Sequence, residues 1–160
     1  VSLASGTAVH GALERWEPRS SAPIVEALRD LASRAAREHG ADPAAVEREA
    51  REVLDAFLAS PLPARLLSVE VLGREVPVLL LEEDGTTVTG ALDLLYRDGD
   101  GSVVVADYKT DRGLDPREAA ARYGPQILVY AEAVRRAMRL PAPPRAELWL
   151  LRQGEIVPVS

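Results

Sequence analysis

Cysteine is absent from this chain of 160 residues. Without a thiol the protein can form no disulfide, no thiolate zinc site and no iron–sulfur cluster, and it has no cysteine nucleophile. No apolar run approaches the roughly 20 residues that a membrane-spanning helix needs, and the N-terminal residues lack a signal-peptide pattern. These absences predict a cytoplasmic protein without a membrane partner.

An excess of positive charge is also missing. The formal net charge is −6 and the sequence pI is about 5.0. Free-standing nucleic-acid binders usually carry a basic face, so this balance argues against one. It is compatible with action on DNA if a neighbouring domain or subunit delivers the strand. Acids gathered around a metal site would also make the balance negative.

Lysine is almost absent as well. Of the 19 basic residues, 18 are arginine and only Lys109 is lysine. Alanine and proline are abundant, which indicates a GC-rich coding bias that replaces lysine by arginine wherever either residue serves. Lysine is a compact ammonium, whereas arginine is a planar fork. Lys109 is therefore a candidate for chemistry that arginine cannot perform; the alternative is chance survival at a surface site.

Length and composition are typical of one globular domain with a sizeable core, since the chain has 160 residues and an apolar content of 47%. We expect a helical part over about residues 1–60, and a sheet with its helices over about residues 61–160. The chain starts with Val1 rather than Met. This start predicts that the chain was excised from a longer polypeptide.

The first part favours three helices. Apolar residues recur at helical spacing over residues 5–16, 24–39 and 43–58. Gly40 is the expected C-terminal stop of the second helix. Asp42 is the expected N-cap of the third, because it precedes a proline at the first helical position.

The middle of the chain favours β-strands. We expect strands at Leu66–Leu72, Glu75–Leu81, Val88–Tyr96 and Val103–Lys109. The first two are expected to form a hairpin around the short Gly73-Arg74 connection. The last begins with four residues that are apolar on both faces, which is typical of a central strand covered on both sides.

The last part combines helix and strand. Asp115-Pro116 begins a helix, and Gly124-Pro125 is expected to interrupt it before a fresh helix runs to Arg139. Two strands are expected at Ala146–Leu151 and Ile156–Val159. The order of the elements predicts an α/β or α+β fold with one mixed sheet.

Charged residues lie at the end of the expected central strand, and one charged residue lies within the neighbouring strand. Side chains two apart in a strand point the same way, so Asp107 and Lys109 share a face. Asp93 lies in an otherwise apolar strand, and pairing of the two strands would bring it near Asp107. Two close carboxylates repel each other unless a divalent cation holds them, and oxygen ligands suit Mg²⁺ or Mn²⁺. The alternatives are a surface salt bridge at the strand end and a buried turn acid at Asp93.

Two acids and a lysine around such an ion form a phosphodiester-cleaving arrangement. The ion would activate a water molecule and neutralise the charge that grows on the phosphate oxygens. Lys109 would orient that water or stabilise the same charge. The residues therefore point to metal-dependent hydrolysis of a phosphodiester.

Five short motifs extend this pattern over most of the chain. They occupy residues 6–14, 75–77, 90–96, 107–110 and 123–131. Each is weak alone, but together and in this order they resemble the PD-(D/E)xK nucleases, in particular the RecB/AddA-type nuclease domain of helicase–nucleases. The iron–sulfur branches of that family need four cysteines and are excluded. The resemblance implies a single nuclease domain over residues 1–160, with a restriction-endonuclease-like α/β core whose central mixed sheet is flanked by helices.

The resemblance also implies a ligand set. His10 on the first helix would bind the metal together with Asp93, Asp107 and the backbone carbonyl of Tyr108. Lys109 would be the catalytic base or the residue that positions the water. Leu92 precedes Asp93 where many members of the superfamily have proline.

Further residues receive supporting roles from the resemblance. Gln126 and Tyr130 are one helical turn apart, face the same way and would hold DNA or the active-site strand. Tyr123 would lie near them, although the expected break at Gly124-Pro125 leaves its geometry open. Glu75 would support the site; the alternative is a strand-edge acid paired with Arg74.

The resemblance finally implies a function. We expect a Mg²⁺- or Mn²⁺-dependent deoxyribonuclease, the exonuclease domain of a helicase–nuclease in double-strand-break repair. Its partners would be single- or double-stranded DNA ends and a helicase domain or subunit. The protein would be associated with the bacterial nucleoid. The alternatives are a catalytically inactive DNA-binding or scaffolding module of the same fold and a stand-alone restriction- or phage-type exonuclease.

Overall fold

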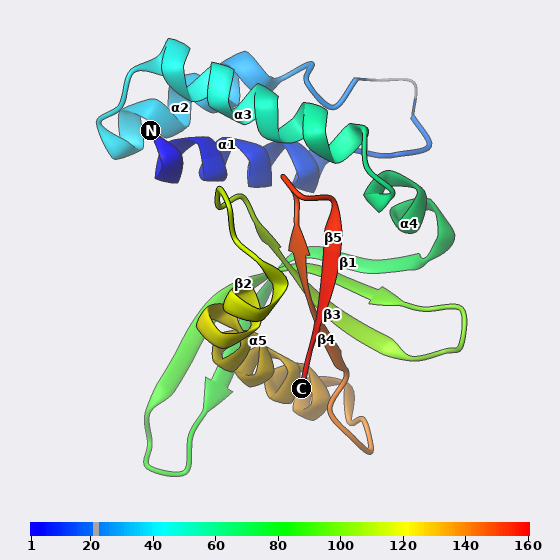
Figure 1. Cartoon of the computed structure of the whole chain (residues 1–160). Coiled ribbons are helices and arrows are strands. Elements are labelled where there is room, and N and C mark those ends of the chain that lie inside the picture. The colour runs from blue at the N-terminus through cyan, green and yellow to red at the C-terminus, as the bar shows by residue number, and fades with distance from the viewer. Residues whose placement is uncertain (21–22) are drawn as a thin grey trace. The chain divides into compact units, whose positions relative to one another are not determined.

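The computed structural model describes residues 1–20 and 23–160 (Figure 1). Their elements run in the order α1 (Ser2–Arg15), α2 (Leu28–His39), α3 (Pro43–Leu58), α4 (Leu62–Ser68), β1 (Glu70–Leu81), β2 (Thr87–Arg97), β3 (Val103–Lys109), α5 (Pro116–Met138), β4 (Arg145–Leu150) and β5 (Glu155–Val159). None of the helices in this described part is long and apolar enough to cross a membrane.

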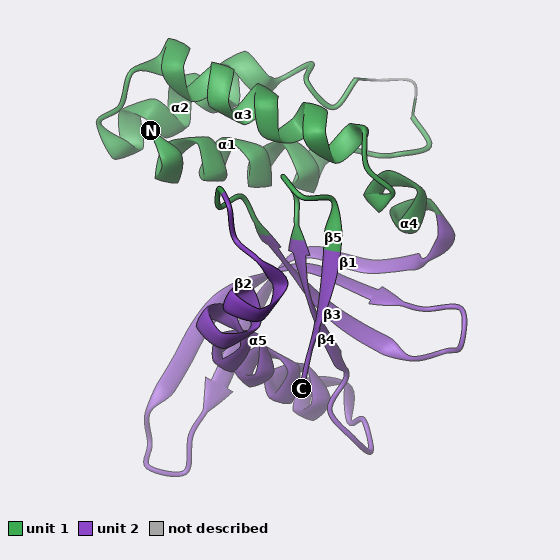
Figure 2. Ribbon diagram, viewed as in Figure 1, with its two compact units in different colours: residues 1–67, 109–112, 150–155 green, residues 68–108, 113–149, 156–160 purple. Residues whose placement is uncertain are grey.

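The chain forms two compact units (Figure 2). The helical unit contains residues 1–67, 109–112 and 150–155. The sheet unit contains residues 68–108, 113–149 and 156–160. Two short segments thus leave the ends of β3 and β4 to join the helical unit.

The helical unit begins with three helices, as predicted. Asp42 caps α3, since its Oδ2 accepts from the Ala45 amide at 2.9 Å, and Gly40 ends α2 with a φ of 63°. The helix predicted from Ile24 starts only at Leu28, because residues 24–27 form hydrogen-bonded turns instead. The core of this unit is apolar and includes Val9, Leu13, Leu28, Val53, Leu54 and Phe57.

The sheet unit contains one five-stranded sheet in the order β1-β2-β3-β4-β5. β1 pairs with β2, and β2 with β3, in antiparallel fashion. β3 and β4 are neighbours joined through α5, the crossover that parallel strands require. The result is the predicted α/β fold with a mixed sheet.

A buried acid holds the sheet together across β3. Glu147 of β4 is 7% exposed. It accepts from the hydroxyl of Tyr96 on β2 at 2.5 and 2.8 Å, and from the indole of Trp149 at 3.2 Å. Neutral donors therefore satisfy this carboxylate, as a buried acid requires.

The predicted hairpin of Leu66–Leu72 and Glu75–Leu81 is wrong. Residues 66–68 of its first half belong to the short helix α4, where the Ser60 hydroxyl accepts from the Leu62 amide at 3.2 Å, and residues 70–72 already belong to β1. Its second half belongs to β1, which runs without a turn through Gly73. A bulge between Val71 and Gly73 absorbs the irregularity that resembled a turn.

The predicted interruption of the last helix is also wrong. α5 is continuous from Pro116 to Met138 with Pro125 inside it. A proline in a helix interior removes one backbone hydrogen bond and costs about 3 kcal/mol. Ile127 and Tyr130 are buried just after it, so packing of the following turn offsets this cost.

Candidate metal centre

Glu75 of β1 and Asp93 of β2 face each other across the first pair of strands. The register pairs the residues on either side of them, which places the two opposite each other. Their carboxylate oxygens lie within 4.8 Å of each other. Asp93 is 6% exposed and Glu75 is half-buried. Like charges this close and this poorly solvated are unfavourable alone, so the pair fits a hard divalent cation.

The backbone of Tyr108 orients the Asp93 carboxylate. The Tyr108 amide donates to Asp93 Oδ2 at 2.7 Å. A bond to a charged acceptor is strong, and a carboxylate has further lone pairs with which to bind an ion. The bond also joins β2 to β3 beside Asp107, as the sequence predicted for the two strands.

The phenol of Tyr108 stays neutral. Burial raises its pKa, and the nearby charge of Asp93 raises it further. The ring is packed against Trp149, with centroids 6.1 Å apart. Tyr108 therefore offers its backbone to the site and adds no negative charge to it.

Glu75 has an unusual backbone conformation. Its φ is 47°, in the left-handed region that residues other than glycine seldom adopt. The bend brings the Val76 side chain over Gly73, where an added Cβ would lie 2.7 Å from Val76 Cγ2. Such strain costs on the order of 1–3 kcal/mol and clusters at functional sites, which favours a functional role for Glu75.

β3 ends as predicted, with half-buried Asp107 and Lys109 on either side of buried Tyr108. Continuing the β2–β3 register by one residue brings Asp107 opposite Asp93. Among the described residues, the group whose ligand atoms all lie within 4.8 Å of one another includes Glu75 and Asp93 but not Asp107. Binding of the same ion by Asp107 stays a prediction.

Two predicted site residues belong to the helical unit. His10 is half-buried on α1, and its role as a ligand stays a prediction. Lys109 is the last residue of β3, and its backbone carbonyl accepts from the Leu151 amide at 3.0 Å. Both residues lie on regular elements, as the sequence predicted.

Gln126 and Tyr130 are neighbours on α5. The Gln126 side-chain amide donates to the Tyr130 hydroxyl at 3.4 Å. Tyr130 is 8% exposed and lies over β2 at Gly90, where an added Cβ would clash with its hydroxyl oxygen. Gln126 is exposed. The buried ring contacts the strand that carries Asp93, and Gln126 is an exposed residue beside the ring's hydroxyl.

Tyr123 lies one turn before this pair on the unbroken α5 helix. It is half-buried, and the guanidinium carbon of Arg122 lies 5.0 Å from the centroid of its ring. A cation over a ring at this distance is a stabilising contact. The continuous helix settles the geometry that the expected break had left open, while a role of Tyr123 in the site stays a prediction.

The position of Glu75 is the main addition of the structure to the predicted site. On sequence alone Glu75 is a supporting residue, whereas here its carboxylate lies beside that of Asp93. The motif at residues 75–77 is the signal that could have identified it. Its spacing from Asp93 carries no information, because only the strand register brings the two residues together.

Comparisons with known proteins identify the family of the chain. The family model described as "PD-(D/E)XK nuclease superfamily" matches residues 1–158. The chain is 30% identical over 140 residues to an ATP-dependent helicase/nuclease subunit of Streptococcus sanguinis, covering 82% of the chain and 11% of that relative. It is 37% identical over 98 residues to the protein of the same name in Pelotomaculum thermopropionicum, covering 52% of the chain and 8% of the relative. The chain thus spans about a tenth of the length of these curated relatives.

Proposed function

Because the chain belongs to the PD-(D/E)XK nuclease superfamily, we propose that it is a divalent-metal-dependent deoxyribonuclease that hydrolyses phosphodiester bonds. The observation that carries the proposal is the close approach of the Glu75 and Asp93 carboxylates, within 4.8 Å of each other. Two poorly solvated acids held together in this way form a ligand pair for an oxygen-seeking cation.

The proposed ligands include the carboxylate pair. Glu75 and Asp93 provide carboxylate oxygens, and we assign Asp107, the Tyr108 carbonyl and the His10 imidazole as further ligands. Mg²⁺ and Mn²⁺ both suit oxygen donors, and the imidazole favours Mn²⁺ slightly. The bound ion supplies Lewis acidity toward the phosphate and lowers the pKa of a bound water.

Lys109 is the proposed catalytic residue beside these ligands. It follows Asp107 by two positions on one strand, so its ammonium is directed to the same face of β3. A positive charge there stabilises the negative charge that develops on phosphate oxygens and orients the attacking water. Lys109 is also the single lysine among 19 basic residues.

The α5 residues have different proposed roles. Tyr130 packs on β2 at Gly90 and fixes the strand that carries Asp93. Gln126 is exposed next to the Tyr130 hydroxyl, which makes its amide available to DNA. We assign Tyr123 a supporting contact on the same helix.

The relatives suggest a setting for the activity. Their name joins a helicase and a nuclease, and we propose that the chain is the exonuclease part of such an enzyme, acting on DNA ends in double-strand-break repair. A helicase domain or subunit that feeds the strand would explain how a chain with a net charge of −6 acts on DNA. The corresponding location is the cytoplasm, at the nucleoid.

The test is cleavage of linear single- and double-stranded DNA by the purified protein with Mg²⁺, with Mn²⁺ or with a chelator. We expect cleavage only with a divalent ion, and a loss on the order of 10²–10³-fold for Lys109→Ala. Asp55→Asn, which changes an exposed acid of α3, is the matched control. Cleavage by Lys109→Ala at the parental rate would refute the assignment, and a protein that binds DNA but never cleaves it would be the inactive scaffold.

A further inference from the structure

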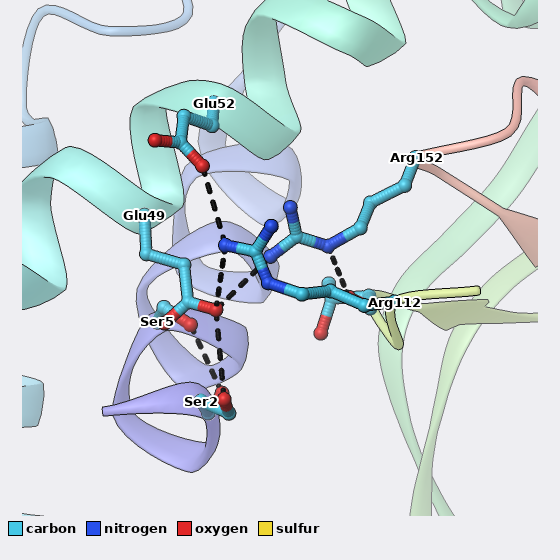
Figure 3. A network of polar contacts seen from close by, with 7 residues as sticks. Ser2, Ser5, Glu49, Glu52, Arg112 and Arg152 are labelled. Carbon is cyan, nitrogen blue, oxygen red and sulfur yellow. Dashed lines mark hydrogen bonds and ion pairs between the residues drawn. The ribbon is translucent and has the colours of Figure 1, made fainter. Parts of the chain in front are cut away.

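Glu49 is the buried acid of the helical unit. It lies on α3 and is 8% exposed. Its Oε1 accepts from Arg152 at 3.1 Å, from Arg112 at 3.4 Å and from the Ser2 hydroxyl at 3.5 Å (Figure 3). One carboxylate oxygen thus joins α3 to α1 and to the segments that follow β3 and β4.

Arg152 connects this carboxylate to the backbone next to Lys109. Its Nε donates to the Thr110 carbonyl at 2.6 Å while its terminal nitrogen donates to Glu49. The preceding residue, Leu151, donates its amide to the Lys109 carbonyl at 3.0 Å. The backbone carbonyls of Lys109 and Thr110 therefore both accept hydrogen bonds from residues of the turn between β4 and β5.

The two arginines are not equivalent. The side chain of Arg152 is 14% exposed, whereas that of Arg112 is 64% exposed and also contacts Glu52 at 3.3 Å. A surface ion pair is screened by water, but a buried one is not. Burial lowers the pKa of the Arg152 guanidinium, and the charge of Glu49 opposes that shift. The Glu49–Arg152 pair is therefore the main interaction, and Arg112 is an outer contact.

α1 is held against the same segment. A Cβ added to Gly6 would lie 3.3 Å from the Thr110 hydroxyl, so α1 packs closely on the residue after Lys109. The Ser2 hydroxyl on α1 reaches Glu49 as well. α1 carries His10, so two proposed site residues lie on segments that this network joins.

We propose that Glu49 and Arg152 are positioning residues for Lys109. Arg152, paired with Glu49, fixes the Thr110 carbonyl directly, and its neighbour Leu151 fixes the Lys109 carbonyl. The pair thereby holds the backbone from which the Lys109 ammonium projects. Only a guanidinium donates in two fixed directions at once, so lysine at position 152 keeps the charge but loses one of the two contacts. This inference rests on the proposed nuclease function of Lys109.

The test is the rate of DNA cleavage under single-turnover conditions for Arg152→Lys and Glu49→Gln. Small displacements of a catalytic group cost up to about 10²-fold, and we expect a loss of about 10- to 100-fold with Mn²⁺ affinity unchanged. Glu47→Gln changes a more exposed acid of the same helix, one that pairs with Arg51, and should keep the parental rate. Hydrogen exchange at the Leu151 amide should accelerate in Arg152→Lys.

A double variant separates positioning from a merely structural role. If Arg152 acts through Lys109, Arg152→Lys slows the parental protein but leaves the residual rate of Lys109→Ala unchanged. An equal slowing in both backgrounds, or a rate for Arg152→Lys like that of Glu47→Gln, would overturn the inference. Should Glu49→Gln fail to fold, Arg152→Lys carries the test, because it keeps the charge opposite Glu49. Failure of the nuclease proposal itself is distinct, since the parental protein would then cleave no DNA, and failure of the role of Lys109 would show as cleavage by Lys109→Ala at the parental rate.

Discussion

Glu49 of the helical unit and Asp93 of the sheet unit are both buried acids, with 8% and 6% of their surface exposed. Glu49 lies among guanidinium groups, those of Arg112 and Arg152. Asp93 lies within 4.8 Å of a second carboxylate, that of Glu75. Opposite charges stabilise the first acid, whereas the like charge beside the second is an arrangement that the proposed divalent cation would stabilise. The sign of the neighbouring charge, more than burial itself, is what distinguishes Glu49 from the proposed ligand Asp93.

Replacing Asp93 by asparagine should show most clearly that the two acids have different roles. We expect cleavage of DNA with Mn²⁺ to fall on the order of 10³-fold, because the charge that holds the ion is lost. The free energy of unfolding without metal should change by less than about 1 kcal/mol, since the carboxylate repulsion disappears. Cleavage rates and denaturant unfolding, measured beside Asp55→Asn, check both parts. An Asp93→Asn protein that is strongly destabilised but still cleaves DNA at the parental rate would contradict this prediction.

Replacing Glu49 by glutamine should have its main effect on stability. We expect the free energy of unfolding to fall by about 3 kcal/mol, because the change leaves the guanidinium of Arg152, whose side chain is 14% exposed, without its charge partner. Glu47→Gln removes a more exposed acid of the same helix and should cost less than about 0.5 kcal/mol. Equal losses in the two variants, measured by denaturant unfolding, would mean that Glu49 behaves as a surface acid.

Gly90→Ala tests whether the Asp93 strand is held by close packing. The added Cβ would clash with the Tyr130 hydroxyl oxygen, so the ring or the strand must move. We expect a loss of about 2 kcal/mol in the free energy of unfolding, partly restored by Tyr130→Phe. Gly99→Ala is the control, because a Cβ there meets nothing within 4 Å. Thermal unfolding that is equal for the two alanine variants would argue against the close contact.

Glu132 offers a more solvated acid for comparison with the two buried ones. Hydrogen bonds from Arg135 and Arg136 lower its pKa from 4.5 to about 2. A carboxyl group with a lowered pKa adds stability above its unfolded value, and this contribution is lost as the pH falls from about 4.5 toward 2. Glu132→Gln should therefore lower the melting temperature slightly at neutral pH and have a smaller effect at pH 2. A difference that grows on acidification would contradict the sign of the shift.

The sequence predicts those parts of the fold that depend on local patterns. β3 has the expected bounds, Val103–Lys109, because four apolar residues follow a glycine-rich turn and end in charged ones. The start of α3 was predictable from Asp42 and the proline after it. The continuity of α5 through Pro125 was not, because packing of the buried residues beyond it decides the outcome.

The candidate site also has one part that local sequence patterns predict and another that they do not. The sequence proposes Asp93, Asp107 and Lys109 because charge at these positions conflicts with the apolar strands around them, and their roles stay predictions. The closeness of Glu75 to Asp93 depends on the β1–β2 register. Glu49 and Arg152 are 103 residues apart in the chain, and no periodicity connects them. Pairings of this kind are set by tertiary structure and leave no local pattern.

Calorimetric titration of Mn²⁺ into the purified protein, its Glu75→Gln variant and the Asp55→Asn control would test the carboxylate pair most directly. The like-charged pair predicts binding by the parental protein and by Asp55→Asn, and an affinity at least about 10-fold weaker for Glu75→Gln. Equal affinity in all three proteins would contradict a metal site at Glu75 and Asp93.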